Sequence, residues 1–242
     1  MRFLRRLVFA TVCTFCFSVN GALSSANFPS GSLNKVIPDG NPAGYADTIT
    51  VSGMESSLVS VSVGLQVSGG WNGDLYAYLT HGETLVVLLN RVGRFDDGAS
   101  AFGYSDSGFN ITLGTTGTDI HDYQSVPNYA TLITQPDHVW KADGRLSDPN
   151  TVTFATPPST SLVNFNNANP NGDWTLFLAD MSGGGVSTLG SWSLNLEAVP
   201  EPATIALAIA GCVFGCFQFF RHLRSRKTGV QRRCVANPRL FT

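Results

Sequence analysis

Residues 59–67 alternate strictly between branched apolar side chains and small or polar ones. The apolar members are Val59, Val61, Val63, Leu65 and Val67. A period of two sustained over this stretch is the pattern of a β-strand with one buried face, and no helix produces it. A chain built around such a strand must pair it with other strands and cover its apolar face.

Further strands are predicted on the C-terminal side of this run. Residues 75–80 alternate in the same way, and residues 84–89 form a continuous apolar run suited to a strand covered on both faces. Near the end of the stretch, residues 174–178 and 192–196 each place their large apolar side chains on one face. The Gly-rich segment 181–190 between them predicts a turn or a long hairpin loop.

Residues 27–198 contain 21 glycines, no cysteine and no amphipathic helical window. This composition predicts an all-β domain, a sandwich rather than an alternation of strands and helices. The lack of cysteine excludes a disulfide framework and a zinc site built on thiolates.

Charge is strongly segregated along the chain. Between Lys35 and Glu201, seventeen Asp and Glu stand against five Lys and Arg, a net charge of −12, whereas the tail from Arg221 carries +7 and no acid. Binding of nucleic acid requires clustered Lys and Arg to neutralise phosphates, so the acidic stretch is not expected to bind nucleic acid.

The N-terminal segment has the layout of a signal peptide. A basic start with Arg2, Arg5 and Arg6 precedes the apolar run 7–19, and small residues follow. Residues 1–26 are therefore predicted to direct export, with cleavage after Ala22 or Ala26.

The C-terminal segment is predicted to enter a membrane, at least transiently. Residues 203–220 are apolar apart from Thr204 and Gln218, and as a helix they rise about 27 Å, close to the hydrocarbon thickness. The basic residues that follow place the tail 221–242 in the cytoplasm and the acidic stretch outside.

A series of short motifs follows in a fixed order along residues 37–194. They are Ile37-Pro38-Asp39, Trp71-Asn72-Gly73-Asp74-Leu75, Asn90-Arg91-Val92-Gly93, Asn171-Gly172-Asp173-Trp174 and Leu189-Gly190-Ser191-Trp192. Together they resemble the P domain (P/Homo B domain) that follows the catalytic domain in subtilisin-like proprotein convertases. The resemblance implies a jelly-roll-like β-sandwich for residues 27–198. Residues 103–158 depart from the pattern.

The end of the chain carries a second resemblance. Residues 199–202 read Val-Pro-Glu-Pro, and the apolar segment and an arginine-rich end follow. This arrangement is similar to the PEP-CTERM sorting signal of exported proteins in bacteria that make extracellular polysaccharide. It implies an exosortase-type membrane protease as a partner, cutting near Pro200, Glu201 and Pro202. The two prolines fix φ and remove donors, which keeps the site extended. The alternative is a rigid spacer before a permanent anchor.

No catalytic residue is predicted. Serine protease chemistry needs a serine, a histidine and a carboxylate in one site. His81-Gly82 falls inside the P-domain-like motif block, and the segment 103–107 lacks the second glycine of a nucleophile elbow.

Calcium is the cofactor that the acidic loops favour. Asp96 and Asp97 match an acidic loop of the P-domain family, and a hard cation takes several carboxylate and carbonyl ligands. The alternative is that both acids only cap turns. His121 and His138 lie beside carboxylates but are expected to be hydrogen-bonded surface residues rather than zinc ligands.

These features predict an exported, non-catalytic P-domain module, anchored in the membrane or released to the cell surface or extracellular matrix of a bacterium, with a binding or structural role. One alternative is a regulatory domain that acts with a separate subtilisin-like serine endopeptidase. The other is a carbohydrate-binding jelly roll that contacts exopolysaccharide through Trp71, Tyr76, Tyr78 and Tyr104. Trp174 and Trp192 are in phase with apolar leucines and are expected in the core.

Overall fold

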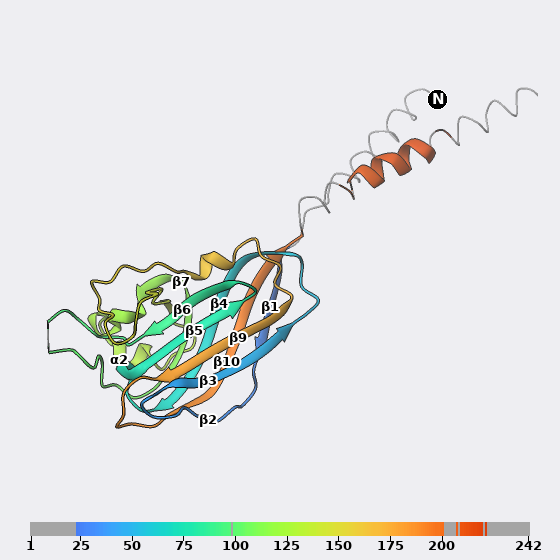
Figure 1. The fold of residues 1–242 in the computed structure, drawn as a ribbon. Helices are drawn as coiled ribbons and strands as arrows, with labels where there is room; N and C mark the ends of the chain where they lie inside the picture. The colour runs from blue at the N-terminus through green and yellow to red at the C-terminus, as the bar shows by residue number, and fades with distance from the viewer. Residues whose placement is uncertain (1–22, 98, 201–206, 208, 220, 222–242) are drawn as a thin grey trace, which may run out of the picture. The chain divides into compact units, whose positions relative to one another are not determined.

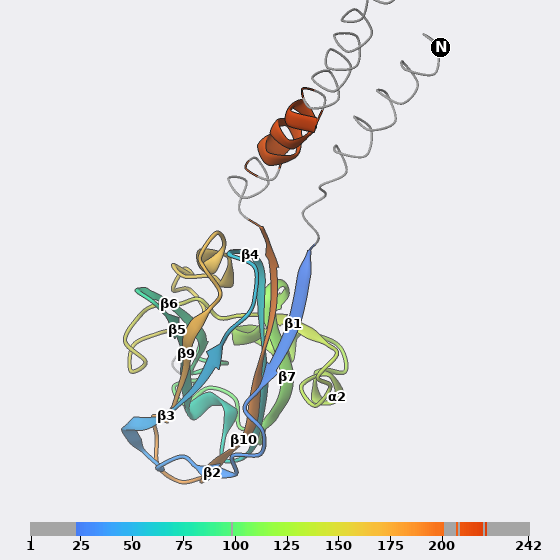
Figure 2. The same ribbon diagram turned by 90° about the vertical axis from the view of Figure 1, so that its right-hand side faces the viewer.

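The computed structural model describes residues 23–97, 99–200, 207, 209–219 and 221. Residues Leu23–Val199 form one compact unit in which two β-sheets pack face to face (Figures 1 and 2). The prediction of an all-β sandwich is confirmed.

The first sheet has the strand order β1-β10-β4-β7-β8, and β2 also pairs with β10. Its strands are β1 (Ser24–Pro29), β2 (Lys35–Val36), β4 (Ser57–Gly69), β7 (Phe109–Asp119), β8 (Val139–Lys141) and β10 (Ser187–Val199). All pairs are antiparallel except β7 with β8. The alternating run 59–67 lies within β4, at the middle of this sheet.

The second sheet has the strand order β3-β9-β5-β6. Its strands are β3 (Asn41–Val51), β5 (Leu75–His81), β6 (Thr84–Asn90) and β9 (Gly172–Asp180), and every pair is antiparallel. The edge strand β6 is covered on its free side, because Asp143 and Gly144 donate their backbone N–H groups to the carbonyls of Leu88 and Val87. Val86, Val87, Leu88 and Leu89 are all fully buried, so this strand is covered on both faces as its apolar run predicts.

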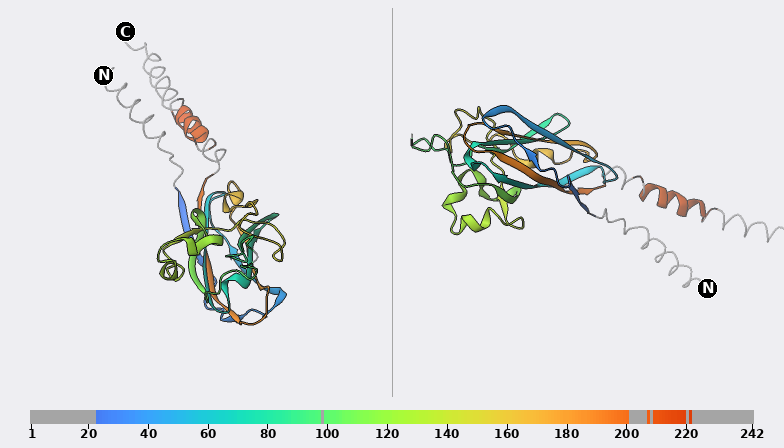
Figure 3. Two further views of the ribbon diagram at one scale, coloured as in Figure 1. Left: turned by 90° about the vertical axis from the view of Figure 1, so that its left-hand side faces the viewer. Right: turned by 90° about the horizontal axis from the view of Figure 1, so that it is seen from below.

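The region that the sequence left unassigned, 103–158, supplies β7, β8 and short helical turns. These are η2 (Ile120–Ser125) and α2 (Tyr129–Leu132), with η1 (Asn72–Asp74) and η3 (Leu162–Phe165) elsewhere in the chain. In Figures 2 and 3 the green part of this segment, which includes α2, lies beside β7. The part after β8 continues to β6.

Of the two alternatives predicted for residues 181–190, a turn or a long hairpin loop, the structure has the turn, and the hairpin is wrong. β9 pairs with β3 and β5 in the second sheet, whereas β10 pairs with β1 and β4 in the first. The glycines therefore serve a turn that carries the chain from one sheet to the other, and the two strands do not pair.

Tryptophans fill the space between the sheets. Trp140, Trp174 and Trp192 are among the largest fully buried side chains, and they share one apolar cluster with the inward leucines and valines of both sheets. The expectation that Trp174 and Trp192 lie in the core is confirmed.

Both terminal predictions extend beyond the described residues. β1 begins at Ser24, which pairs with Ala198, so signal cleavage after Ala22 would leave β1 whole and cleavage after Ala26 would remove its first three residues. At the other end, residues 209–219 are helical. Within the described parts of the chain, no helix is both long and apolar enough to cross a membrane.

Candidate functional site

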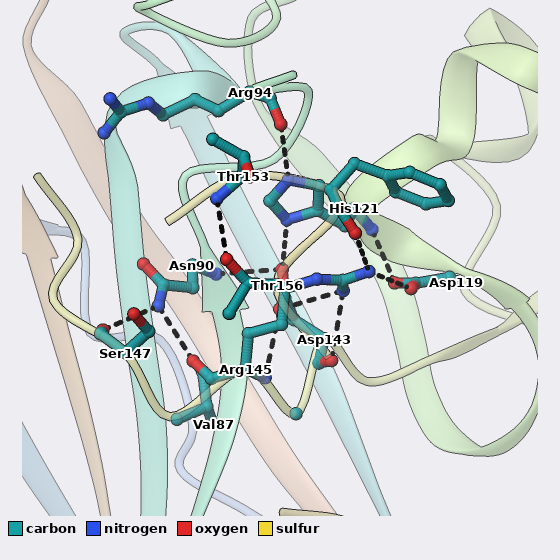
Figure 4. A network of polar contacts seen from close by, with 12 residues as sticks. Val87, Asn90, Arg94, Asp119, His121, Asp143, Arg145, Ser147, Thr153 and Thr156 are labelled. Carbon is teal, nitrogen blue, oxygen red and sulfur yellow. Dashed lines mark hydrogen bonds and ion pairs between the residues drawn. The ribbon is translucent and has the colours of Figure 1, made fainter. Parts of the chain in front are cut away.

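A buried polar network joins β6, the start of η2 and the segment after β8 (Figure 4). At its centre, the His121 Nδ1 atom lies 2.7 Å from the Asp143 Oδ2 atom, and both side chains are 0% exposed. The His121 Nε2 atom lies 3.1 Å from the backbone carbonyl oxygen of Arg94. The expectation that His121 is a surface residue is therefore wrong.

The local sequence explains where this histidine sits. Asp119 caps η2 by accepting the backbone N–H of His121 at 2.9 Å, and this turn directs the imidazole inward. The acid next to His121 in the sequence does not contact its ring, because Asp122 accepts a hydrogen bond from the Tyr104 hydroxyl. The carboxylate that meets the ring comes from the segment after β8, which no local pattern indicates.

Arg145 extends the network with two ion pairs. Its guanidinium donates to Asp119 Oδ2 at 2.8 Å and to Asp143 Oδ1 at 3.2 Å. Burial alone would lower the pKa of Arg145, but the hydrogen bonds and charges of Asp119 and Asp143 outweigh it and raise that pKa. Arg145 is thus fixed as a cation between two carboxylates.

Asn90 and Arg94 tie the same segment to the end of β6. The Asn90 Nδ2 atom donates to the carbonyls of Arg145 and Ser147 at 2.8 and 3.0 Å. Arg94 donates to the carbonyls of Pro149 and Asn150. The network therefore fastens a long irregular segment to the sandwich.

The His121–Asp143 pair lacks the third member of a hydrolytic site. In such a site the ring nitrogen opposite the carboxylate accepts a proton from a nucleophile. Here that nitrogen faces a backbone carbonyl, and the pair is closed off from solvent. Both ring nitrogens of His121 thus face groups of the chain itself, the Asp143 carboxylate and the Arg94 carbonyl.

A second buried ion pair lies at the start of β5. Arg91 donates to Asp74 Oδ1 at 3.1 Å and to Ser182 Oγ at 2.8 Å. Burial raises the pKa of Asp74 and lowers the pKa of Arg91. The charge and the hydrogen bond of the partner act in the opposite direction on each pKa, but they are smaller than the effect of burial. Burial also raises the pKa of Asp180, and the negative charge of Asp74 adds to this rise.

The two candidate calcium ligands lie in the turn after residue 94. Asp97 accepts the backbone N–H groups of Ala99 and Ser100 at 2.9 and 2.8 Å, together with the Ser100 hydroxyl. These bonds, that of the Ser100 backbone first, lower the pKa of Asp97. Within the described residues, no three His, Cys, Asp or Glu side chains are grouped so as to hold a metal ion. Asp97 has the turn-capping contacts of the alternative interpretation, and calcium binding stays a prediction.

The four aromatic residues considered for carbohydrate do not form one row. Tyr76 and Tyr78 lie together on the outer face of the second sheet, where Tyr78 stacks on Phe177 at a centroid distance of 4.8 Å. Tyr104 packs edge-on against the buried Tyr123. Trp71, at the end of β4, is 43% exposed.

The outer face of the first sheet has a hollow of about 460 Å³. It lies across β1, β10, β4 and β7, and the loops at residues 31–32 and 136 form its rim. Its polar lining consists of Asn27, Ser32, Gln66, Asn110, Thr112, Ser191, Ser193 and Asn195. Gly64, at an outward position of the alternating run, also lines it.

The sorting residues lie at the boundary of the described chain. β10 ends at Val199, and Pro200 follows without regular structure. Glu201 and Pro202 lie outside the described residues.

Neither a protein-family model nor a curated protein sequence matches this chain, so neither supports the P-domain or the PEP-CTERM resemblance. Among solved structures, the chain is weakly similar to the serine protease of Aeromonas sobria, at 13% identity and a TM-score of 0.42 over 74% of this chain and 28% of that one. The complex of that protease with its chaperone gives 12% identity, a TM-score of 0.42, and 79% and 30% coverage. The chain thus spans less than a third of those chains.

Proposed function

We propose that residues 23–199 are a non-catalytic, P-domain-like binding module with a jelly-roll fold, exported and sorted to the cell envelope or to the exopolysaccharide matrix. An exosortase-type membrane protease is the proposed partner at Pro200, Glu201 and Pro202. The segment 203–220 holds the precursor in the membrane at least until that cut, and the tail 221–242 stays inside.

One observation carries the non-catalytic part of this proposal. The histidines best placed for proton transfer are used in structural contacts: His121 is enclosed between Asp143 and a backbone carbonyl, and His81 lies between two more carbonyls. A general base must reach the proton that it removes. Neither ring has a nitrogen turned toward a hydroxyl or thiol nucleophile.

The test has two parts. The full chain, purified in detergent, is incubated with a generic peptide substrate with and without a serine protease inhibitor, and it is separately mixed with exopolysaccharide from the bacterium that encodes it. We expect no inhibitor-sensitive hydrolysis and co-sedimentation with the polysaccharide. Hydrolysis blocked by the inhibitor would overturn the non-catalytic assignment, and a protein that stays in the supernatant would overturn the matrix-binding role.

Carbohydrate binding is the more specific candidate within this function. The lining of the hollow on the first sheet favours it, since eight of its fifteen residues carry an amide or a hydroxyl side chain. The aromatic row of Tyr76, Tyr78 and Phe177 on the opposite sheet is the competing location.

A further inference from the structure

Gly64, which carries no side chain, is one of the residues that line the hollow on the first sheet. Four strands place Pro29, Ser193, Gly64 and Thr112 in one cross-strand row, so all four belong to the same outer face. The Ser193 hydroxyl lies over Gly64, where a Cβ atom would meet the Ser193 Oγ atom at 2.5 Å, so a side chain at residue 64 would push this hydroxyl into the hollow. Its φ is not left-handed, so the backbone does not require glycine. Glycine inside a strand often marks a place where a ligand approaches closely.

Neighbouring rows supply the hydrogen-bonding groups. On one side Asn27 donates to Asn195 Oδ1 at 2.7 Å, and on the other Ser191 donates to Gln66 Oε1 at 3.1 Å. These bonds orient the amides and leave the Gln66 and Asn195 NH₂ groups with donors to spare. The Asn110 side chain, next to Gln66 in register, makes no hydrogen bond within the described part of the chain.

The hollow is uncharged in a strongly acidic domain. None of its lining residues is Asp, Glu, Lys, Arg or His, although the stretch between Lys35 and Glu201 carries −12. Most sites for phosphate or metal ions contain at least one side chain of opposite charge, so a lining without charge favours a neutral ligand. Amides and hydroxyls both donate and accept, which matches the hydroxyl groups of a neutral sugar.

We propose that this hollow binds a neutral oligosaccharide, with Gly64 as the floor and Asn110, Gln66 and Asn195 as hydrogen-bonding walls. The volume lies within the range of small-ligand sites. This inference rests on the proposed binding function and names its ligand class and its location.

The test uses the full chain in a zwitterionic detergent without a sugar headgroup. Calorimetric titrations are made with neutral cello-, malto-, manno- and galacto-oligosaccharides and with anionic oligogalacturonate. Gly64→Ala fills the floor, and Asn110→Ala removes an amide that makes no intramolecular bond, so its loss spares the fold. Ser60→Ala, on the same face of β4 but outside the hollow, is the matched control.

We expect saturable binding of at least one neutral probe and none of oligogalacturonate. Gly64→Ala and Asn110→Ala should each weaken the affinity by on the order of tenfold, whereas Ser60→Ala should leave it unchanged. The inference fails if no neutral probe binds, or if Gly64→Ala binds like the wild type. It also fails if Tyr78→Ala abolishes binding while Gly64→Ala and Asn110→Ala do not. That result would place the binding site at Tyr76, Tyr78 and Phe177 on the second sheet.

The two proposals can fail separately. Gly64→Ala protein that still co-sediments with exopolysaccharide as the wild type does would leave the binding function standing and reject the hollow. Wild-type protein that binds neither exopolysaccharide nor any probe would reject both.

Discussion

The imidazole of His81 stacks on the indole of Trp174, with ring centroids 4.0 Å apart and planes inclined by only 3°. The His81 ring nitrogens lie 2.9 and 2.7 Å from the backbone carbonyls of Asp173 and Asn169. Carbonyl oxygens only accept, so in each hydrogen bond the ring nitrogen is the donor. His81 thereby joins the end of β5 to the loop before β9.

We expect His81→Phe to lower the free energy of unfolding by about 1–3 kcal/mol, because the stacked ring remains while two hydrogen bonds to backbone carbonyls, each worth about 0.5–1.5 kcal/mol, are lost. For a domain of this size, that is a fall of about 2–4 °C in melting temperature per kcal/mol. Thermal unfolding followed by circular dichroism measures it. His138→Phe is the matched control, since His138 makes an edge contact with Trp140 and no side-chain hydrogen bond within the described residues.

Asp143→Ala should be among the most destabilising single changes. It leaves His121 without its carboxylate and removes one of the two anions that hold Arg145. Breaking a buried ion pair from one side costs about 3–5 kcal/mol. Urea unfolding should show a lower midpoint, and Asp137→Ala, at an exposed loop position, should not. A midpoint equal to the wild type would mean that the network contributes nothing to stability.

The sequence predicted the strands that alternate and missed the network. The period of two in β4 and β5 depends only on neighbours in the chain, so it can be read directly. His121 and Asp143 are 22 residues apart, and Asn90 lies 55 residues before Arg145. Such pairs are set by how segments fold back on the sandwich, which no local pattern records.

The hollow on the first sheet likewise combines a feature that is visible in the local sequence with contacts that are not. Gly64 was visible as an outward residue in the alternating run, but its neighbours Ser193 and Thr112 come from strands far along the chain. The residues that surround Gly64 on the sheet can be identified only once the register of the strands is known.

Stability should depend on pH through Asp180. Its pKa is raised on folding, chiefly by burial, so the native state holds the proton more tightly than the unfolded chain. The contribution of Asp180 to the free energy of unfolding is therefore most favourable below the ordinary carboxyl pKa of about 3.9. It is lost as the pH rises through the raised pKa that Asp180 has in the native state.

Asp180→Asn cannot ionise, so its stability relative to the wild type should increase between pH 4 and pH 7. Chemical unfolding at several pH values measures this difference. Asp173→Asn, an exposed position on the same strand, should show no such trend. A constant difference between Asp180→Asn and the wild type across this range would contradict the assignment.

Calcium should stabilise the domain if Asp96 and Asp97 bind it. A ligand at 100 times its dissociation constant adds about 2.7 kcal/mol. Asp97 caps a turn whether or not calcium binds, so the informative quantity is the change in melting temperature between calcium and EDTA. Replacing both acids with alanine should abolish that change, and a wild type that melts identically in calcium and EDTA would leave only the turn-capping role.

Processing at the C-terminus should depend on Glu201. β10 is paired with β4 up to Val199, so the folded domain ends one residue before the Pro-Glu-Pro triplet. A proline disfavours a helical conformation in the residue before it, so the sequence Val-Pro-Glu-Pro favours the extended form that a protease requires. The apolar segment and its basic flank are expected to set membrane insertion. Glu201→Ala should therefore leave insertion intact and cause full-length precursor to accumulate. Immunoblotting of a C-terminally tagged chain in its own bacterium measures this, and wild-type protein that keeps its tag at full length would identify a permanent anchor instead.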